Sequence, residues 1–329
     1  MRSYTNDLLP MINTSIYWTL VRIDAAGDRQ IQSLSSAQTF FNQIFAELTN
    51  VGNFSSRDIQ SQLLDLYQQD TSIDNHINAQ RTLLCFISWE IEKVCLNLEK
   101  QFGNSGGFSS HDLLPYVLDD DGRLQSKSSY QFYSLEIFYS FDINQSSLSS
   151  WTNRKVRQHP ALSKFLLECG IYLLSDWAIL NDTQPKQLER ILSQFHSLSV
   201  TEIQQNKWLL ASYHAVYRAQ RLQQRKVRKT SKCQPPSIEQ LEQISDKLNN
   251  LSQGKYCEKP HNLMSQLQQL AGYLREYRIH VRGGFLATES IDAAGNDISI
   301  SNYNDNEENQ TSEFLKLYRP QFLECLDNA

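Results

Sequence analysis

The spacing of apolar residues along the chain predicts a protein built mainly of helices. From Ser36 to Thr49, apolar side chains recur every three or four residues, which places them on one face of a helix. The same spacing follows Ser56 and is most extensive from Asn75 to Phe102, where Gly103 is a plausible helix stop. Because this stripe is the most apolar, we expect its helix to be central to the first domain. Weaker periodicity from Leu8 to Ile23 predicts one more helix.

Start signals predict the helices of the second half. Ser199 and Glu202 have the spacing of a capping box, in which each residue hydrogen-bonds the backbone of the other. Thr183 is expected to cap a helix that has Pro185 in its first turn, and Ser110 to cap a short helix earlier in the chain. Further amphipathic segments are Ala161–Leu180, a helix pair around Gly170, and then Ser237–Leu251 and Asn262–Tyr277. We therefore predict an all-α fold of several multi-helix domains.

Shifts in composition suggest how the helices are grouped. Pro and polar clusters mark boundaries, and a stretch rich in Gly, Asn, Asp and Glu indicates a linker. The predicted segments are an N-terminal helical region (1–103), a helical core (104–160, with part of the helix 75–102), a helical domain ending in a basic helix (161–232), a helix pair (233–282), an acidic flexible linker (283–311) and the start of a truncated C-terminal helix (312–329).

Composition then narrows the class of protein. With 40% hydrophobic and 20% charged residues the chain fits a soluble globular protein, and its 12 Gly and 8 Pro are too few for a β-sandwich. The net charge of −5 gives no overall case for nucleic-acid binding, so such binding would need a local basic patch. No signal peptide and no apolar run long enough for a membrane span stands out. Cys85, Cys95 and Cys169 lie in apolar helical contexts typical of buried, reduced thiols, and we expect a cytoplasmic protein without a membrane partner.

Motifs of catalysis and cofactor binding do not stand out. The six cysteines include no Cys-x-x-Cys pair and no His at ligand spacing, which argues against zinc. The glycines of 103–107 lack the flanking pattern of a phosphate-binding loop. The acidic stretch 119–129 lacks the spacing of a calcium loop, and we expect it to be a solvated loop. We therefore expect no enzyme activity, no cofactor, no metal and no small-molecule substrate.

The segment from Ser134 to Arg157 is the most informative part of the sequence. It has the pattern of two helices joined by a polar turn, the first ending at Phe141-Asp142 and the second opening after serines. The second helix carries one large aromatic residue and three cations: Trp151, Arg154, Lys155 and Arg157. A basic, aromatic helix face is what binding to nucleic acid requires, although Trp151 could equally be a core residue.

A second basic feature follows downstream. Seven cations lie between positions 218 and 232 with no acid among them: Arg218, Arg221, Arg225, Lys226, Arg228, Lys229 and Lys232. In a chain of negative net charge this segregation favours contact with nucleic acid or another polyanion. A solvated basic helix extension is the other interpretation, and the sequence leaves both open.

The region from Leu83 to His159 resembles the helical core of the sigma-70 family, the promoter-binding subunits of bacterial RNA polymerase. Asp112-Leu113-Leu114 resembles an Asp-Leu element of that family, and Leu135–Asp142 resembles its apolar helix ending in Phe-Asp. Ser147–Trp151 resembles its turn and aromatic residue, and Val156-Arg157 its basic helix end. The later run Leu166–Thr183 resembles sigma-factor-like proteins typical of cyanobacteria. The family's C-terminal helix-turn-helix is not recognisable, and the paired helices of 183–217 are its nearest match.

This resemblance implies a transcription protein whose partners are the RNA polymerase core and promoter DNA. Asp112, Leu113 and Leu114 would contact polymerase, Trp151 would stack on an unpaired base, and Arg154, Lys155 and Arg157 would contact phosphates. In this hypothesis the basic segment supplies further DNA contacts through Arg218, Arg221, Arg225, Lys226, Arg228 and Lys229. The alternative hypothesis is a non-catalytic, all-helical protein-interaction or scaffold protein that does not bind DNA.

Overall fold

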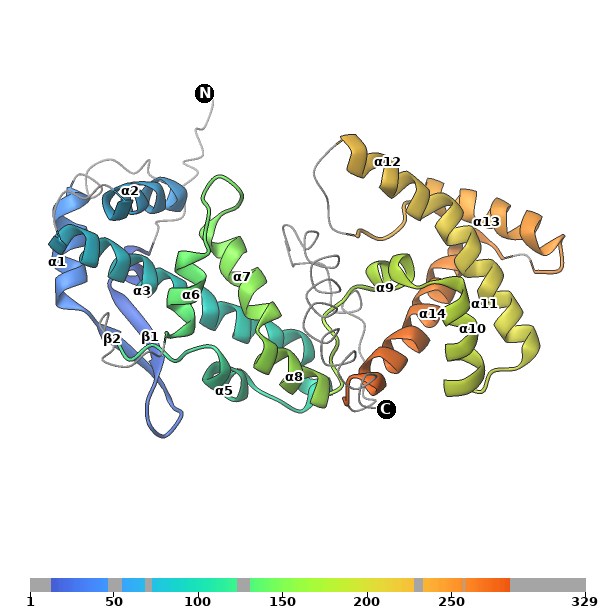
Figure 1. The fold of residues 1–329 in the computed structure, drawn as a ribbon, viewed down its shortest axis with the longest axis horizontal. Coiled ribbons are helices and arrows are strands. Elements are labelled where there is room, and N and C mark those ends of the chain that lie inside the picture. Colours follow the sequence, from blue (N-terminus) through green and yellow to red (C-terminus); the bar gives the residue numbers. More distant parts are fainter. Residues whose placement is uncertain are drawn as a thin grey trace, which may run out of the picture. The chain divides into compact units, whose positions relative to one another are not determined.

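Helices account for most of the structure, a computed structural model that describes residues 13–46, 55–68, 73–122, 131–227, 233–256 and 258–284 (Figure 1). The predicted all-α, multi-helix fold is confirmed, with one small sheet as its only β structure in those ranges. Contacts divide the chain into two compact units, Met1–Phe165 and Leu166–Ala329. None of the described helices has both the length and the apolar character needed to cross a bilayer.

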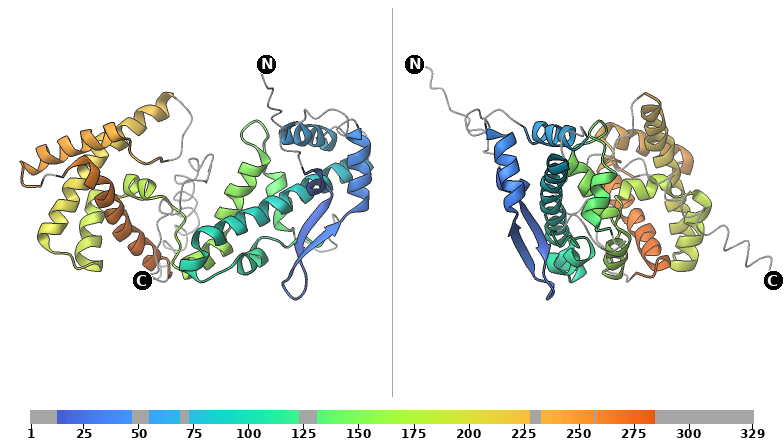
Figure 2. Two further views of the ribbon diagram at one scale, coloured as in Figure 1. Left: turned by 180° about the vertical axis from the view of Figure 1, so that it is seen from behind. Right: turned by 60° about the vertical axis from the view of Figure 1, so that its left-hand side comes forward.

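The first unit is organised around one long helix, α3 (Ile73–Leu98), as its apolar stripe predicted. Its inward face includes Leu83, Leu84, Ile87 and Ile91, which have no measurable exposure. The surrounding elements pack on α3 from several sides (Figure 2). They are α1 (Ser35–Ile44), α2 (Ser56–Gln68), β1 (Thr19–Ile23), α5 (Ser110–Leu113), α6 (Tyr133–Tyr139) and α7 (Leu148–Gln158).

The predicted helix over Leu8–Ile23 is wrong in the part that the structure describes. A short 3₁₀ turn, Thr14–Tyr17, leads into β1, which pairs antiparallel with β2 (Arg29–Ser33). The β-branched residues of Thr19–Ile23 favour a strand, and Leu20 and Val21 are fully buried. The turn between the strands includes Gly27 at φ +88°, a backbone conformation that glycine adopts without strain.

Gly103 does not end the long helix. The chain passes from α3 through a π-helical turn (Glu99–Gly103) and the single turn α4 (Asn104–Gly106), and it stops at Gly107, whose φ is +67°. The real constraint at Gly103 is space, because a Cβ there would lie 2.7 Å from the backbone oxygen of Phe108. The cap of α5 is Ser109 rather than Ser110.

The second unit is a set of helices around a single apolar core (Figure 1). Gly170, at φ +78°, separates α8 (Pro160–Glu168), most of which belongs to the first unit, from the following helix, as the sequence predicted. The helices after it are α9 (Asp176–Asp182), α10 (Pro185–Arg190) continued by a π turn (Ile191–Phe195), α11 (Val200–Tyr213) continued by a π turn (His214–Arg218), α12 (Ala219–Val227), α13 (Ile238–Ser252) and α14 (Pro260–Val281).

Two capping predictions in this unit have different outcomes. Ser199 and Glu202 form the predicted capping box at the start of α11. Thr183 instead closes the end of α9, where its hydroxyl donates to the carbonyl of Ile179 at 2.7 Å, and Gln184 occupies the N-cap position of α10 without a side-chain cap hydrogen bond. The side chain of Thr183 is therefore used by the preceding helix.

The helices of 161–232 and 233–282 share this core rather than forming separate bodies, because α13 and α14 pack on α11 and on each other, and α14 also packs on α9. A buried ion pair joins the two ends of the unit: Arg275 of α14 donates to Asp176 of α9 at 2.6 Å and to the carbonyls of Tyr172 and Leu174 at 2.7 Å each. The predicted acidic linker beyond residue 284 and the predicted helix 312–329 lie outside the described residues.

Among the described cysteines, the prediction of buried thiols is confirmed for Cys85 and Cys95, whereas Cys169 is half-buried. Burial raises the pKa of both buried thiols to about 12. These two groups are therefore neutral and unreactive at physiological pH.

Candidate nucleic-acid interface

The region singled out in the sequence forms the predicted pair of helices, α6 and α7, joined by a polar turn. The turn is held by Asp142, whose carboxylate accepts hydrogen bonds from the backbone N–H of Asn144 at 2.9 Å and from the side chain of Gln145 at 3.0 Å. Ser147 caps α7 by accepting from the N–H of Ser150 at 3.2 Å. The first helix ends at Tyr139, so Phe141 and Asp142 belong to the turn.

Trp151 is held at one end and partly exposed. Its indole N–H donates to the carbonyl of Ile137 on α6 at 3.1 Å, and the side chain as a whole is half-buried. Two cations of the same helix lie over its ring, with the Arg154 guanidinium carbon 4.2 Å and the Lys155 ammonium 5.4 Å from the ring centroid. Cations in this position are attracted by the electron-rich face of the indole. The three side chains together form a cation–aromatic stack on α7.

The stack also contacts α6 through Lys155. The Lys155 ammonium lies 3.9 Å from the carboxylate of Glu136, and the Tyr133 hydroxyl donates to the backbone carbonyl of Lys155 at 2.6 Å. The contacts of the Lys155 ammonium with Trp151 on α7 and with Glu136 on α6 restrict where this side chain can point. Arg157 behaves differently: it is only 3% exposed, and as placed it offers almost no surface to a phosphate.

The three residues that the sequence predicted to bind polymerase differ in their exposure to solvent. Leu113 and Leu114 are buried in the core of the first unit, at 0% and 3% exposure. Asp112 is exposed, and its carboxylate accepts from the N–H of Ser109 at 2.9 Å and from its hydroxyl at 2.8 Å. The backbone hydrogen bond from Ser109 is the main reason why the pKa of Asp112 lies below its ordinary value. Of the three, only Asp112 has an exposed side chain.

The basic segment downstream begins inside the second unit. Arg218 is half-buried at the end of the π turn, and Arg221 is buried on α12. Arg225 and Lys226 lie in the last part of α12, but their side chains lie outside the described part of the structure, as do residues Arg228, Lys229 and Lys232. The predicted basic helix is therefore observed as far as Val227.

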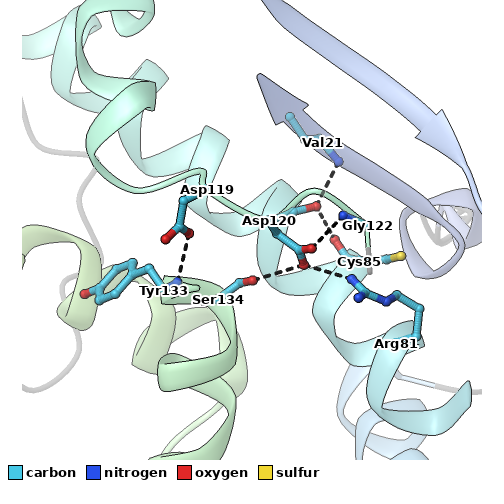
Figure 3. A network of polar contacts seen from close by, with 9 residues as sticks. Val21, Arg81, Cys85, Asp119, Asp120, Gly122, Tyr133 and Ser134 are labelled. Carbon is cyan, nitrogen blue, oxygen red and sulfur yellow. Dashed lines mark hydrogen bonds and ion pairs between the residues drawn. The ribbon is translucent and has the colours of Figure 1, made fainter. Parts of the chain in front are cut away.

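Behind α6 lies a buried polar network that the sequence did not reveal (Figure 3). Arg81 of α3 and Asp120 form an ion pair at 2.8 Å, with side chains only 4% and 1% exposed. The Asp120 carboxylate also accepts from the N–H of Gly122 at 2.8 Å and from the Ser134 hydroxyl at 3.3 Å. The prediction of a solvated loop for the acidic stretch 119–129 is therefore wrong at Asp120, whose side chain is buried in the first unit.

The neighbouring Asp119 extends this network to the first residue of α6. Its carboxylate accepts from the N–H of Tyr133 at 2.8 Å (Figure 3). Tyr133 and Ser134 are thus both fixed by consecutive aspartates, which sets the position of α6 on α3. Because Trp151 is anchored on α6, the network also positions the cation–aromatic stack. The signal that could have revealed it is Arg81, a cation within an otherwise apolar helical stripe.

No cluster of three His, Cys, Asp or Glu side chains able to hold a metal ion occurs in the part of the chain that the structure describes. No family model matches the sequence, and neither the curated proteins nor the solved structures include a significant match. The resemblance to the sigma-70 family therefore rests on the residues quoted above, and the geometry of α6 and α7 has to be judged by its own chemistry.

Proposed function

We propose that this chain is a sigma-factor-like transcription protein that binds promoter DNA through α7 and binds the RNA polymerase core. The observation that carries the proposal is the half-buried Trp151 ring with Arg154 and Lys155 stacked over it. Such a group offers a nucleic acid two complementary things, an aromatic surface and positive charge.

The chemistry of the stack suits an unpaired base better than a duplex groove. Stacking of a base on an aromatic side chain contributes about 1–3 kcal/mol and tolerates any sequence. A base that stacks on this ring face displaces the Arg154 guanidinium from it, and the displaced guanidinium can pair with the adjacent phosphate in bidentate geometry. Because the indole N–H already bonds the carbonyl of Ile137, the ring is oriented before DNA arrives, and little side-chain entropy remains to be lost.

Polymerase binding is the second part of the proposal. Asp112 is supported as a contact by its exposure and by the resemblance of Asp112-Leu113-Leu114 to a sigma-factor element. The burial of Leu113 and Leu114 leaves them the role of holding α5 in place. The capped carboxylate of Asp112 retains further lone pairs with which to meet a basic surface.

The alternative function is an all-helical protein-interaction protein that does not bind DNA. The observation that favours it is the internal use of residues assigned to binding: Leu113, Leu114 and Arg157 are buried. The two functions differ in one measurable property, which is whether α7 contributes to affinity for DNA.

The test is fluorescence anisotropy with a labelled single-stranded DNA over a series of salt concentrations. The double variant Arg154→Gln with Lys155→Gln should weaken binding and reduce the slope of log affinity against log salt by about 1.4, since each lost phosphate contact on a single strand contributes about 0.7. The matched control is Lys93→Gln with Lys100→Gln, which removes the same charge from exposed positions along and just beyond α3. Equal effects of the two double variants would exclude α7 as the DNA contact.

Polymerase binding is tested by co-purification of this chain with bacterial core RNA polymerase. Asp112→Asn removes the charge while keeping an oxygen that can cap α5, so the helix should persist. We expect the wild type to be retained and Asp112→Asn to be retained less, with Glu202→Gln, the same kind of change in the capping box of the second unit, as the control. If wild type is not retained while DNA binding is intact, polymerase has to be removed from the proposal.

A further inference from the structure

The sheet of the first unit has one edge that nothing covers among the described residues. β1 lies against α3, where the N–H of Val21 donates to the hydroxyl of Ser88 at 3.0 Å. β2 makes its main contacts with β1 alone and lies at the outside of the unit (Figure 2). Every residue of β2 except Gln32 is exposed, and Ile31 at its centre is 48% exposed.

The register shows which backbone groups face outward. In an antiparallel pair, opposite residues alternate between those that exchange hydrogen bonds and those whose N–H and C=O point away. Val21 is opposite Ile31, and its N–H points to Ser88, so this pair is of the second kind. The same alternation follows from the bonds that flank the sheet, Asp24 N–H to Asp28 at 2.9 Å and Leu34 N–H to Trp18 at 2.9 Å. The outward groups of β2 therefore belong to Arg29, Ile31 and Ser33.

An open edge of this kind is a template for another strand, and proteins usually block such edges with Pro, inward charges or a bulge. The strand Arg29-Gln-Ile-Gln-Ser33 contains no proline, and its one charge lies at the end. The Arg29 guanidinium is already directed back to Glu92 on α3, with one bond at 3.1 Å, so it does not block the edge. The question is then what strand the sequence of β2 would accept.

We propose that the occupant is a second copy of this chain, paired through β2 in antiparallel fashion about Ile31. The sequence of β2 is nearly symmetric about that residue, which is what a two-fold interface requires. Ile31 would face the partner's Ile31, each glutamine would face a glutamine, and Arg29 would face Ser33. No like charges meet in this register, and two exposed isoleucines cover each other.

The geometry of the outward groups fits the same register. With the two Ile31 residues opposite each other, the pairs formed by residues 29, 31 and 33 are those that exchange two hydrogen bonds each, giving about six in all. The two-stranded sheets of the two copies would thereby become one continuous four-stranded sheet, which is inherently more stable than a lone hairpin. None of the residues involved belongs to the stack on α7, so the inference is independent of the proposed function.

The test is sedimentation velocity of the full chain over a wide concentration range. The wild type should shift from its monomer mass of 38.1 kDa to twice that value as concentration rises. Ile31→Pro removes one outward N–H without touching the bonds between β1 and β2, so it should leave a folded monomer. A wild type that stays at 38.1 kDa at every concentration would overturn the proposal, as would a dimer that Ile31→Pro leaves unchanged.

A pair of substitutions at one exposed position guards against misfolding of the proline variant. In the dimer, Ser33→Glu places an acid opposite the partner's Arg29 in both of the two symmetric pairs. This change should tighten the dimer by about two- to thirtyfold. Ser33→Arg places like charges there and should weaken it by a similar factor. Both variants should melt as the wild-type monomer does, since the Ser33 side chain is exposed. Effects of the same sign from these two variants would contradict the register.

Discussion

Replacing Asp120 by Asn is the sharpest test of how the first unit is held together. The Arg81 side chain is 4% exposed, and the second terminal nitrogen of its guanidinium has no hydrogen-bond partner among the described residues. Asp120 is thus the main compensation for a buried cation. Asn can still accept from the N–H of Gly122, so the change removes the charge and leaves the loop geometry in place.

The expected loss follows from the burial of both partners. Removing one member of a buried ion pair costs about 3–5 kcal/mol, because the other charge remains in the interior. We expect about 3 kcal/mol for Asp120→Asn, which lowers the melting temperature of a unit of this size by about 6–12 °C. Differential scanning calorimetry is the measurement, because it can separate the transitions of the two units.

A double variant gives the control. Arg81→Met with Asp120→Leu removes both charges, and replacing a buried pair by apolar side chains is often neutral or stabilising. The double variant should therefore be more stable than Asp120→Asn alone. Burial raises the pKa of Asp120, and Arg81 opposes that effect. If Asp120→Asn costs less than about 0.5 kcal/mol, the carboxyl is already neutral in the folded protein and the ion-pair reasoning fails.

Two further predictions concern single residues. Burial lowers the pKa of His214, so the folded protein favours the neutral ring. The second unit should therefore lose stability as the pH falls from 6.5, the ordinary pKa of histidine, through the lower pKa of the folded state. His214→Gln, which can still donate to the carbonyl of Leu180, should flatten the melting temperature between about pH 5 and 7; an unchanged slope would mean that another group titrates. Gly103→Ala should destabilise the first unit by about 1–3 kcal/mol, because its Cβ would lie 2.7 Å from the Phe108 oxygen. Gly107→Asn is the comparison for denaturant unfolding, since that position has a left-handed backbone but open space, and it should cost less.

The helices were predictable wherever one apolar stripe decides the structure. Ile87 and Ile91 follow the helical period, and the capping box of Ser199 and Glu202 is a local signal that tertiary contacts do not alter. The strand Thr19–Ile23 was missed because its period of two is hidden: both Leu20 and Val21 are buried, one on each face. Thr183 was misassigned because a hydroxyl can bond the helix before it as well as the one after it.

The candidate site also has a part that could be predicted from the sequence and a part that could not. The two helices and their polar turn could be predicted from residues 134–157, since capping serines and turn residues act locally. That Arg157 points into the interior while Arg154 stacks on Trp151 depends on which face of α7 meets the rest of the unit. The burial of Asp120 depends on Arg81, 39 residues earlier, and sequence alone gives no distance between them.

The contacts of Arg275 with residues far earlier in the sequence determine the order in which the two units can fold during synthesis. This residue bonds the carbonyl of Tyr172 across 103 positions, and its pair with Asp176 is almost wholly buried. The first unit contains all of its described core by Phe165 and can fold while the rest is being synthesised. The second unit must wait until α14 has emerged, with Asp176 lacking its cation until then. During translation the amino-terminal half is therefore expected to mature first, and the carboxyl-terminal half to depend longest on protection from aggregation.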